Sequence, residues 1–416
     1  MRTLLLFVSS LLITHSTFAA DYYWVGGSGN WSDLSNWATQ SGGTINHNSL
    51  PSPEDDVFFD ANSFSAANQV VTIEADIIFV RDFVWTGDLQ GASIVGPATG
   101  TLNVFGTFQL NPSMNFDYQG DVSFQGSQAD NIIDLSGQML QRDVYFNGVQ
   151  ATWELASALV LDGVLYFQEG VLLSRDFEII AQRMNLNSVE SDSRADLGRS
   201  EVILTGVDQA NTNDPWVLYI NGDSRNPDRF PLANTSFTLN GPRVSVLNLF
   251  NFGENPIGSI KVTSEFGRTR VRSLTPDPLI INYLEVQNNA AYEDELTIDS
   301  LILGGGKNHL FFGGLIFRLS YLESQSTCEE PTQIISATRG LPAIFSSEAL
   351  TIQVEETTIR DIHTQGAATF VANNSVDLGN NQGWTINTKS YNQLFWVGGT
   401  GMWDDPANWS FTSGGP

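Results

Sequence analysis

The sequence from Ala158 to Glu178 reads ALVLDG, VLYFQEG, VLLSRDFE and shows the strand pattern of the chain most clearly. It consists of short apolar runs, each of which ends at a glycine or at charged residues. Runs of β-branched, aromatic and other apolar residues with glycine between them are typical of short β-strands joined by tight corners. The stretch therefore predicts consecutive short β-strands.

Similar runs continue along the rest of the chain. They include Val70–Ile73, Thr101–Phe105, Asp121–Phe124 and Asp143–Phe146. We expect turns at three dipeptides that tolerate positive φ, namely Asn147-Gly148, Asn221-Gly222 and Asn240-Gly241. The one weak candidate for a helix lies near Ser346–Leu350. The predicted fold class is therefore all-β.

The length over which the strand pattern continues distinguishes between the possible architectures. It spans about 370 residues without an evident linker, whereas a single closed core rarely grows beyond about 250–300 residues. A solenoid avoids that limit because each coil contacts only its neighbours. We therefore expect a right-handed parallel β-helix, a solenoid with roughly ten coils of roughly 20 to 25 residues over residues 66–325. Tandem β-sandwiches are the competing architecture.

A repeat marks the two ends of the chain. Residues 23–43 read YWVGGSGNWSDLSNWATQSGG, residues 395–415 read FWVGGTGMWDDPANWSFTSGG, and 12 of these 21 positions are identical at an offset of 395 − 23 = 372 residues. An offset of this size is the length of a domain, far above the period of about 20–50 residues that solenoid repeats have. We therefore expect a Trp/Gly-rich cap and leading segment over residues 21–65, a solenoid with its closing segment over 66–390, and the start of a second repeat unit over 391–416.

The tryptophans of the repeated motif have two interpretations. Glycines permit tight bends, and Trp24, Trp31 and Trp37 can cover the apolar surface of a first coil as an N-terminal cap. Exposed Trp rings can instead form a platform for sugar rings. Because Trp side chains are usually well buried, the cap is the favoured interpretation.

The N-terminus and the charge indicate the compartment. Arg2, the apolar run Leu4–Ile13 and small residues before Ala20 are typical of a signal peptide over residues 1–20, cleaved after Ala19. The run is too short to span a bilayer, which needs about 20 residues, so no transmembrane segment is expected.

With 46 acidic and 19 basic residues the net charge is −27, which disfavours nucleic acid as a partner. The single cysteine, Cys328, is expected to be a small buried hydrophobe and not a reactive thiol.

The motifs of the chain resemble the repeat unit of very long surface proteins from gliding and environmental Gram-negative bacteria. The most specific matches are the WVGG segment at Trp24–Gly27 and the DDVFFD segment at Asp55–Asp60. Looser matches include Val84–Gly87, Val144–Gly148 and the closing segment up to Trp384. Members of this family often resemble adhesins, so the resemblance implies an interaction role for a protein that is secreted or lies on the cell surface. It supplies no catalytic residue to carry over.

The sequence gives only weak signals for catalytic, ligand-binding or metal-binding residues. One expected strand has arginines at alternate positions, Arg268, Arg270 and Arg272, which therefore face the same side. They can bind an anionic sugar, or they can form a solvated face that offsets nearby acids. The solvated face is the favoured interpretation. The acid clusters Glu54-Asp55-Asp56 and Asp404-Asp405 are calcium candidates or, as favoured here, turn caps. His47, His309 and His363 are isolated from one another and from Cys328, without metal-ligand spacing.

These observations predict a non-enzymatic exported repeat protein, an adhesin or a unit of a structural filament. No catalytic or cofactor-binding residue is assigned, no cofactor is expected, and metal binding stays open. The expected partners are an extracellular glycan or cell-surface partner and neighbouring repeat units of the same chain. The alternative is a carbohydrate-active enzyme, a polysaccharide lyase or glycosidase, because β-helices also carry such sites.

Overall fold

The computed structural model describes residues 19–188, 190, 192–206, 216–222, 226–241, 245–250, 252, 254–264, 266–273, 278–388 and 394–415. These residues are almost entirely β and form a parallel β-solenoid of about 13 turns, which confirms the predicted fold class. The chain divides into two compact units: unit 1 comprises Met1–Glu201 with Asp228–Phe230, and unit 2 comprises Val202–Pro227 with Pro231–Pro416. The expected signal peptide lies, up to residue 18, outside the described residues.

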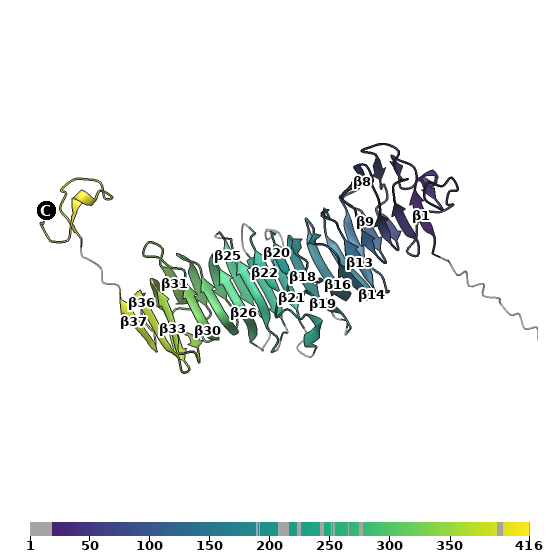
Figure 1. Cartoon of the computed structure of the whole chain (residues 1–416). Helices are drawn as coiled ribbons and strands as arrows, with labels where there is room; N and C mark the ends of the chain where they lie inside the picture. The colour runs from purple at the N-terminus through teal and green to yellow at the C-terminus, as the bar shows by residue number, and fades with distance from the viewer. Residues whose placement is uncertain are drawn as a thin grey trace, which may run out of the picture. The chain divides into compact units, whose positions relative to one another are not determined.

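Unit 1 is a stack of short parallel strands (Figure 1). Its strands are β1 Asp21–Trp24, β2 Gly29–Asn30, β3 Trp37–Ala38, β4 Asp56–Phe59, β5 Val70–Thr72, β6 Ile77–Val80, β7 Phe83–Trp85, β8 Ala92–Gly96, β9 Thr101–Val104, β10 Phe108–Gln109, β11 Met114–Tyr118, β12 Asp121–Phe124, β13 Asn131–Asp134, β14 Val144–Leu155, β15 Leu159–Val160, β16 Val164–Leu173, β17 Ile179–Ala181, β18 Arg183–Asn187 and β19 Arg194–Asp196. A 3₁₀ turn, η1, covers Leu34–Asn36. The chain passes between the units within β20, Glu201–Leu204, within the 3₁₀ turn η2, Pro227–Arg229, and after Phe230.

The core of unit 1 is built from side chains stacked coil upon coil. Phe83 pairs in parallel register with Phe108, and Phe108 with Ile133, so each of these coils takes 25 residues (108 − 83 and 133 − 108). Parallel register places equivalent inward side chains above one another. The rings of Phe83 and Phe108 therefore stack at 5.3 Å, and those of Phe124 and Phe146 at 5.0 Å. Such offset ring pairs add stability to the apolar burial of the coil.

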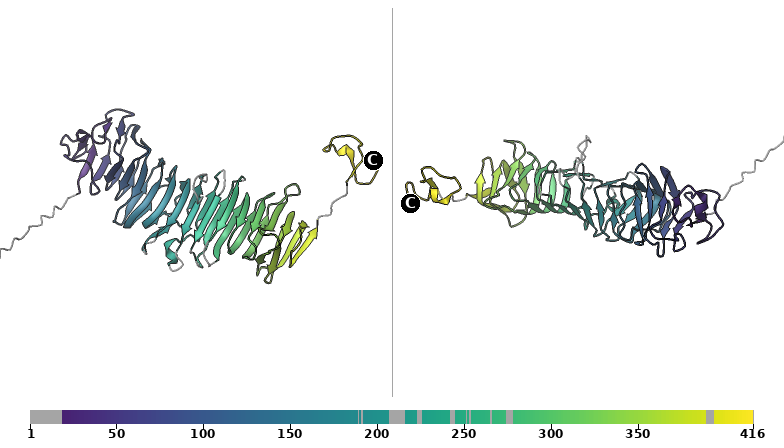
Figure 2. Two further views of the ribbon diagram at one scale, coloured as in Figure 1. Left: turned by 180° about the vertical axis from the view of Figure 1, so that it is seen from behind. Right: turned by 90° about the horizontal axis from the view of Figure 1, so that it is seen from above.

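Unit 2 repeats this architecture with two faces of parallel strands, one containing β23, β25, β27, β29 and β31 and the other β22, β24, β26, β28, β30 and β32. Figure 2 shows the stacked strands from two further sides. Its strands are β21 Leu218–Asn221, β22 Ser236–Leu239, β23 Ser245–Phe250, β24 Ile257–Val262, β25 Arg268–Arg272, β26 Leu279–Val286, β27 Asn289–Tyr292, β28 Leu296–Leu303, β29 Asn308–Phe311, β30 Ile316–Ser324, β31 Thr332–Ser336, β32 Ala343–Ser346, β33 Thr351–Glu355, β34 Thr357–Arg360, β35 Ile362–Gln365, β36 Thr369–Asp377, β37 Trp384–Thr388, β38 Phe395–Trp396 and β39 Trp409–Ser410. The 3₁₀ turn η3 covers Pro406–Asn408.

Two local predictions are wrong. Asn147-Gly148 lies inside β14 at a register shift and does not form a turn. A Cβ on Gly148 would lie 2.5 Å from the Gly126 carbonyl oxygen and 2.3 Å from the Trp153 ring, so the glycine permits close stacking of the chain at a bulge. The weak helix candidate near Ser346–Leu350 does not form a helix, because Ser346 ends β32 and the next amide, that of Ser347, donates to the Gln365 carbonyl.

The prediction for Cys328 is also wrong, since this residue is exposed. It lies in a tight corner after β30 where Thr327 and Glu330 exchange backbone hydrogen bonds of 3.2 Å. A corner of this kind lies outside the strand ladder, so its side chains do not enter the core. Among the described residues, no helix is long and apolar enough to cross a membrane.

Candidate functional site

The tryptophans of the first motif copy are core residues. β1 pairs antiparallel with β3, which places Trp24 opposite Trp37, and parallel with β4. The indole of Trp24 donates to the Gly27 carbonyl at 2.8 Å, and that of Trp37 to the Trp31 carbonyl at 2.8 Å. Because the three side chains are at most 2% exposed, they cannot form a carbohydrate platform. The role of this segment as a cap stays a prediction.

The three arginines of β25 lie on one outward face, as predicted. Arg270 and Arg272 both bind Glu293, with N–O distances of 2.6 Å and 2.8 Å, and Arg268 is exposed. Burial opposes ionisation of Glu293, but hydrogen bonds and charge from the two arginines outweigh it and hold the pKa of this carboxyl below its ordinary value. The pairing supports the interpretation as a charge-compensated face over that of an anionic-sugar site.

The carboxylates of the first-copy acid cluster form hydrogen bonds and an ion pair with neighbouring groups of the protein. Asp55 accepts from the Ala20 amide at 2.9 Å and from the Ser52 hydroxyl at 2.6 Å. Asp56 forms an ion pair with Arg81. These carboxylates stabilise the approach to β4, so turn capping and ion pairing account for them.

The acid pair of the second copy behaves in the same way. Asp405 accepts from the Ala407 amide at 3.0 Å and begins the turn η3, while Asp404 and, in the first copy, Glu54 are exposed. Over the ranges that the structure describes, no three acidic, histidine or cysteine side chains are grouped so that they could hold a metal ion.

The histidines are not brought together with one another or with Cys328. His47 stacks on Tyr22 at 3.6 Å in unit 1. His309 is fully buried in unit 2, where its Nδ1 lies 3.1 Å from the Tyr292 hydroxyl, and burial lowers its pKa to about 3. His363 lies in β35 and forms an isolated bridge with Gln382. Each of the three imidazoles has a separate local contact within the fold, which favours a structural role for these residues.

Unit 2 contains a groove that the sequence analysis did not predict. β30 pairs along its length with β28, but on its other side it pairs with β32 only over Ile316–Arg318. The chain leaves the ladder after Ser346 and returns as β33, which pairs with β36. The second half of β30 therefore faces β33 without a ladder between them, and the gap has a volume of about 540 Å³.

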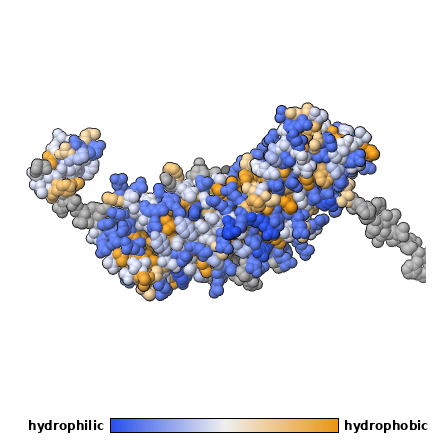
Figure 3. Space-filling model, in the orientation of Figure 1, coloured by the Kyte–Doolittle hydropathy of each residue, from blue (hydrophilic) through white to orange (hydrophobic). Residues whose placement is uncertain are grey.

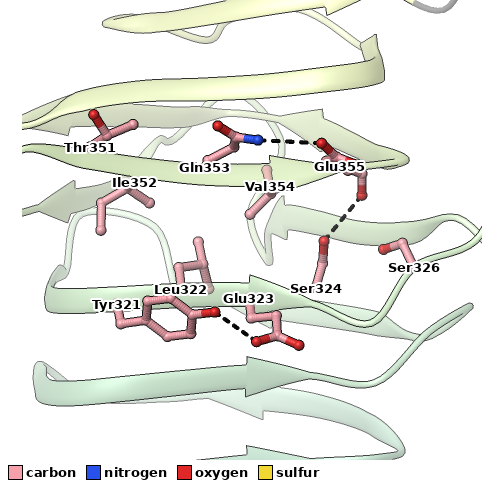
Figure 4. Close-up of a pocket in the computed structure, with 10 residues that line it drawn as sticks. All are labelled: Tyr321, Leu322, Glu323, Ser324, Ser326, Thr351, Ile352, Gln353, Val354 and Glu355. Atoms are coloured by element: carbon pink, nitrogen blue, oxygen red, sulfur yellow. Dashed lines mark hydrogen bonds between the residues drawn. The ribbon is translucent and has the colours of Figure 1, made fainter.

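Strand alternation gives the groove an apolar floor and a polar rim (Figure 4). Leu322, Ile352 and Val354 point inward and are at most 2% exposed. The rim side chains come from the outward positions of both strands; they are Tyr321, Glu323, Gln353 and Glu355. Such alternation follows directly from the period of two in a β-strand.

Hydrogen bonds order this rim. The Tyr321 hydroxyl donates to Glu323 at 2.7 Å, and the Gln353 amide donates to Glu355 at 3.3 Å. Ser324 connects the two strands by donating to the Glu355 carbonyl at 3.1 Å. The bond to Glu323 is the main reason why the pKa of Tyr321 is raised, with a smaller contribution from burial.

The chemistry of the groove is that of an acceptor-rich site beside an aromatic ring. Its lining contains two carboxylates and an amide but no lysine or arginine. The Tyr321 residue is 49% exposed, so the ring is accessible while its hydroxyl is held by Glu323. A neutral ligand with several hydroxyl donors and an apolar face fits this combination.

A local sequence signal accompanies the groove. Tyr321 and Glu323 are two residues apart on β30, and Tyr283 and Glu285 form the same arrangement on β26 with a 2.8 Å hydrogen bond. The repeated Tyr-x-Glu pattern could have marked this outer face. The gap itself follows from the path of residues 347–350, which no strand pattern predicts.

Fold and groove together define a parallel β-solenoid with a tyrosine- and acid-rimmed groove on an outer face. Comparison of the chain with protein-family models, with curated proteins and with solved structures yields no match.

Proposed function

We propose that the chain is a non-enzymatic exported repeat protein of adhesin or filament type that binds a neutral glycan in the groove between β30 and β33. The observation that carries this proposal is the exposed Tyr321 ring beside Glu323, Gln353 and Glu355, above an apolar floor. The signal peptide expected over residues 1–20 and the resemblance to long bacterial surface proteins support a location outside the cell or on its outer surface.

The rim chemistry supports a neutral sugar over an acidic one. Sugar hydroxyls donate hydrogen bonds, and the carboxylates of Glu323 and Glu355 are acceptors when ionised. An acidic sugar would need a nearby cation, yet the lining has neither lysine nor arginine. The net charge of −27 adds a long-range repulsion of anionic polymers.

The size of the groove supports a short saccharide segment. A volume of about 540 Å³ lies within the range of roughly 300–1,000 Å³ typical of small-ligand sites. Leu322, Ile352 and Val354 close the bottom of the groove but are at most 2% exposed, so the apolar contact surface for a ligand comes chiefly from the Tyr321 ring. One aromatic ring with several acceptors gives contact area as well as orientation.

A glycan array with the full chain tests the proposal, followed by titration of the best neutral ligand. Tyr321→Ala is expected to weaken binding at least tenfold, which corresponds to about 1.4 kcal/mol. Tyr283→Ala is the matched control, because it removes a ring from the same type of Tyr–Glu pair outside the groove lining. Absence of neutral-glycan binding, or equal weakening by both variants, would contradict the proposed site.

The adhesin part is tested separately, with beads coated with the full chain and applied to cells that display the bound glycan. We expect attachment that the free glycan inhibits and that Tyr321→Ala reduces. Glycan binding without attachment would exclude adhesion and would leave a filament role.

A second candidate function rests on the two carboxylates in one groove. Glu323 and Glu355 come from facing strands, and glycosidases act with a carboxylate pair. Release of reducing ends from a polysaccharide panel, abolished separately by Glu323→Gln and Glu355→Gln, would support the enzyme. The main proposal expects no release with the unaltered chain.

A further inference from the structure

The Tyr-x-Glu arrangement beside the groove recurs two strands away in the same register. Tyr283 on β26 pairs with Ser300 on β28, and Ser300 pairs with Tyr321 on β30. Register partners in a parallel sheet lie side by side across the strands, so the two tyrosines form one row along the direction in which the coils stack. Because neighbouring strands are about 4.8 Å apart, the two tyrosines are separated by about 9.5 Å along this row.

The two tyrosines have the same local geometry. The hydroxyl of Tyr283 donates to Glu285 at 2.8 Å, and that of Tyr321 donates to Glu323 at 2.7 Å. Both glutamates pair with Ile302 and therefore lie in a second row, next to the row of tyrosines. Burial and the bond to Glu285 raise the pKa of Tyr283 to about 12, which keeps its hydroxyl protonated as the donor. The face thus presents two equivalent pairs of a ring and a carboxylate.

The strand between the two tyrosines has short or buried side chains. In the row of tyrosines the outward residue of β28 is Ser300, and in the second row it is Ile302, which is only 6% exposed. Serine is much shorter than tyrosine, so β28 does not cover the two rings. Among the residues of this row, the rings are therefore the outermost apolar groups.

The row ends at β24 on one side and at the groove on the other. Lys261 on β24 pairs with Glu285, and its ammonium group lies 5.8 Å from the centre of the Tyr283 ring. At the opposite end, Glu323 on β30 faces Glu355 on β33 across the groove. The charge of Lys261 is outweighed by the three carboxylates along the surface, so an anionic polymer is disfavoured.

The surrounding surface is polar. Figure 3 shows a mainly hydrophilic surface over unit 2, with apolar residues among polar ones. Gln287 adds hydrogen-bonding groups beside the second row, because it donates to Glu285 at 2.7 Å and to Gln325 at 2.7 Å and so connects β26 with β30 across β28. Protein partners usually bind larger continuous apolar patches, whereas separate rings with hydrogen-bond acceptors between them suit a ligand rich in hydroxyl groups.

We infer that the glycan proposed for the groove is a linear β-1,4-linked chain that runs along the stacking direction of the coils, with Tyr321 and Tyr283 contacting every second sugar. In an extended β-1,4-linked chain each sugar is flipped relative to its neighbour, so the same ring face recurs every second unit. The length of that repeat is close to the separation of the two tyrosines, and the intervening sugar lies over Ser300. This inference rests on the proposed function and adds a linkage, a direction and a second contact to it.

The test measures binding of defined hexasaccharides to the full chain by isothermal titration calorimetry. The β-1,4-linked probes are cellohexaose, β-mannohexaose and xylohexaose, and the α-1,4-linked probe is maltohexaose, whose chain coils and does not repeat one face along a line. We expect at least one β-1,4-linked hexasaccharide to bind, about tenfold or more tightly than both maltohexaose and its own disaccharide.

Variants of the two tyrosines locate the chain on the surface. Tyr321→Ala should weaken the hexasaccharide and the disaccharide about tenfold or more. Tyr283→Ala should weaken the hexasaccharide about threefold, the smaller effect because this ring is less exposed, and should leave the disaccharide, which the groove alone can hold, unaffected. Tyr283→Phe keeps the ring and should bind the hexasaccharide like the unaltered chain. Tyr219→Ala is the control, because it removes a half-buried outward ring from the other sheet of unit 2.

The possible failures of this inference and of the proposed function give different results. Equal binding of maltohexaose and the β-1,4-linked probes would overturn the linkage, and a hexasaccharide that Tyr283→Ala leaves unaffected would overturn the direction; the proposed function stands in both cases if Tyr321→Ala still weakens binding. Failure of all three β-1,4-linked probes, while another neutral glycan binds on the array, would overturn the inference alone. Absence of binding by every neutral glycan would overturn both.

Discussion

The two motif copies allow the stabilising effect of one tryptophan to be measured at two levels of burial. Trp31 is 2% exposed and its ring lies 4.7 Å from that of Trp37. Trp403 is at the equivalent position 372 residues later and is 77% exposed. Substitution by alanine is the same chemical change at both positions, and it leaves the backbone bonds of the motif in place. A difference between the losses of stability in the two variants therefore measures the effect of burying the ring.

The magnitude follows from the area that the Trp31 ring removes from water. A buried Trp side chain covers roughly 150–250 Å², and at about 25 cal/mol per Å² this amounts to about 4–6 kcal/mol. Residual burial in the unfolded chain lowers this value by roughly 10–40%. We therefore expect Trp31→Ala to cost about 3–5 kcal/mol, in agreement with measured losses for buried aromatic residues. Trp403→Ala is expected to cost less than about 0.5 kcal/mol.

Thermal unfolding of the full chain, followed by circular dichroism, measures the difference. For a unit of this size, roughly 2–4 °C of midpoint is lost per kcal/mol, so Trp31→Ala should lower the transition of unit 1 by about 10 °C. Equal midpoints for Trp31→Ala and Trp403→Ala would show that the burial of Trp31 gives no net stabilisation, contrary to this expectation.

Three further predictions concern single groups. The pKa of His309 is about 3 in the folded chain and about 6.5 when unfolded; the stability from its neutral burial is therefore present above pH 6.5 and lost as the pH falls. Between pH 7 and 5 the loss is about 2 kcal/mol, and urea unfolding of His309→Leu should lack this part of the pH dependence. The pKa of Glu293 is lowered, so its pair with Arg270 stabilises the fold above the unfolded pKa of about 4.3 and ceases to do so as the pH falls through the folded value. Because this pair is partly exposed, Glu293→Gln should cost only about 0.5–1 kcal/mol at pH 7 and nothing at pH 2, as measured by urea unfolding. Gly148→Ala should destabilise unit 1 by about 1–3 kcal/mol in thermal unfolding, since the new methyl group would lie 2.3 Å from the Trp153 ring.

The strand pattern was sufficient to predict the solenoid because it is a local property that every coil repeats. Asp121–Phe124 is a strand in the structure as predicted, and Val70–Thr72 and Thr101–Val104 fall within their predicted runs. Each run has apolar side chains at alternate positions, and parallel stacking needs little more than such runs at similar spacing. The turn predicted at Asn147-Gly148 is a bulge in the structure, because glycine suits a bulge between stacked coils as well as a turn, and contacts with the neighbouring coil determine which of the two forms.

The groove could not be predicted because it arises where the second half of β30 has no strand paired to it on one side. Residues of β30 and β33 alternate as ordinary strands do, and their sequences do not indicate that Ser324 and Glu355 face one another across a gap. That geometry depends on where the chain leaves the ladder after Ser346. The exposure of Cys328 is of the same kind, since composition predicts average burial and a corner position overrides it.

Comparison of the two motif copies separates what the motif itself determines from what its surroundings determine. The internal hydrogen bonds recur in both copies, so they follow from the shared residues, such as Asn36 and Asn408. Burial of the rings does not recur: it requires Phe59 and the strand after it, which lie outside the repeated sequence. An aromatic side chain that is maintained in a folded motif but left uncovered lowers its free energy when a strand covers it. The covering of the rings in the first copy is therefore a contribution of the coil that follows the motif, and the internal hydrogen bonds are a contribution of the motif itself.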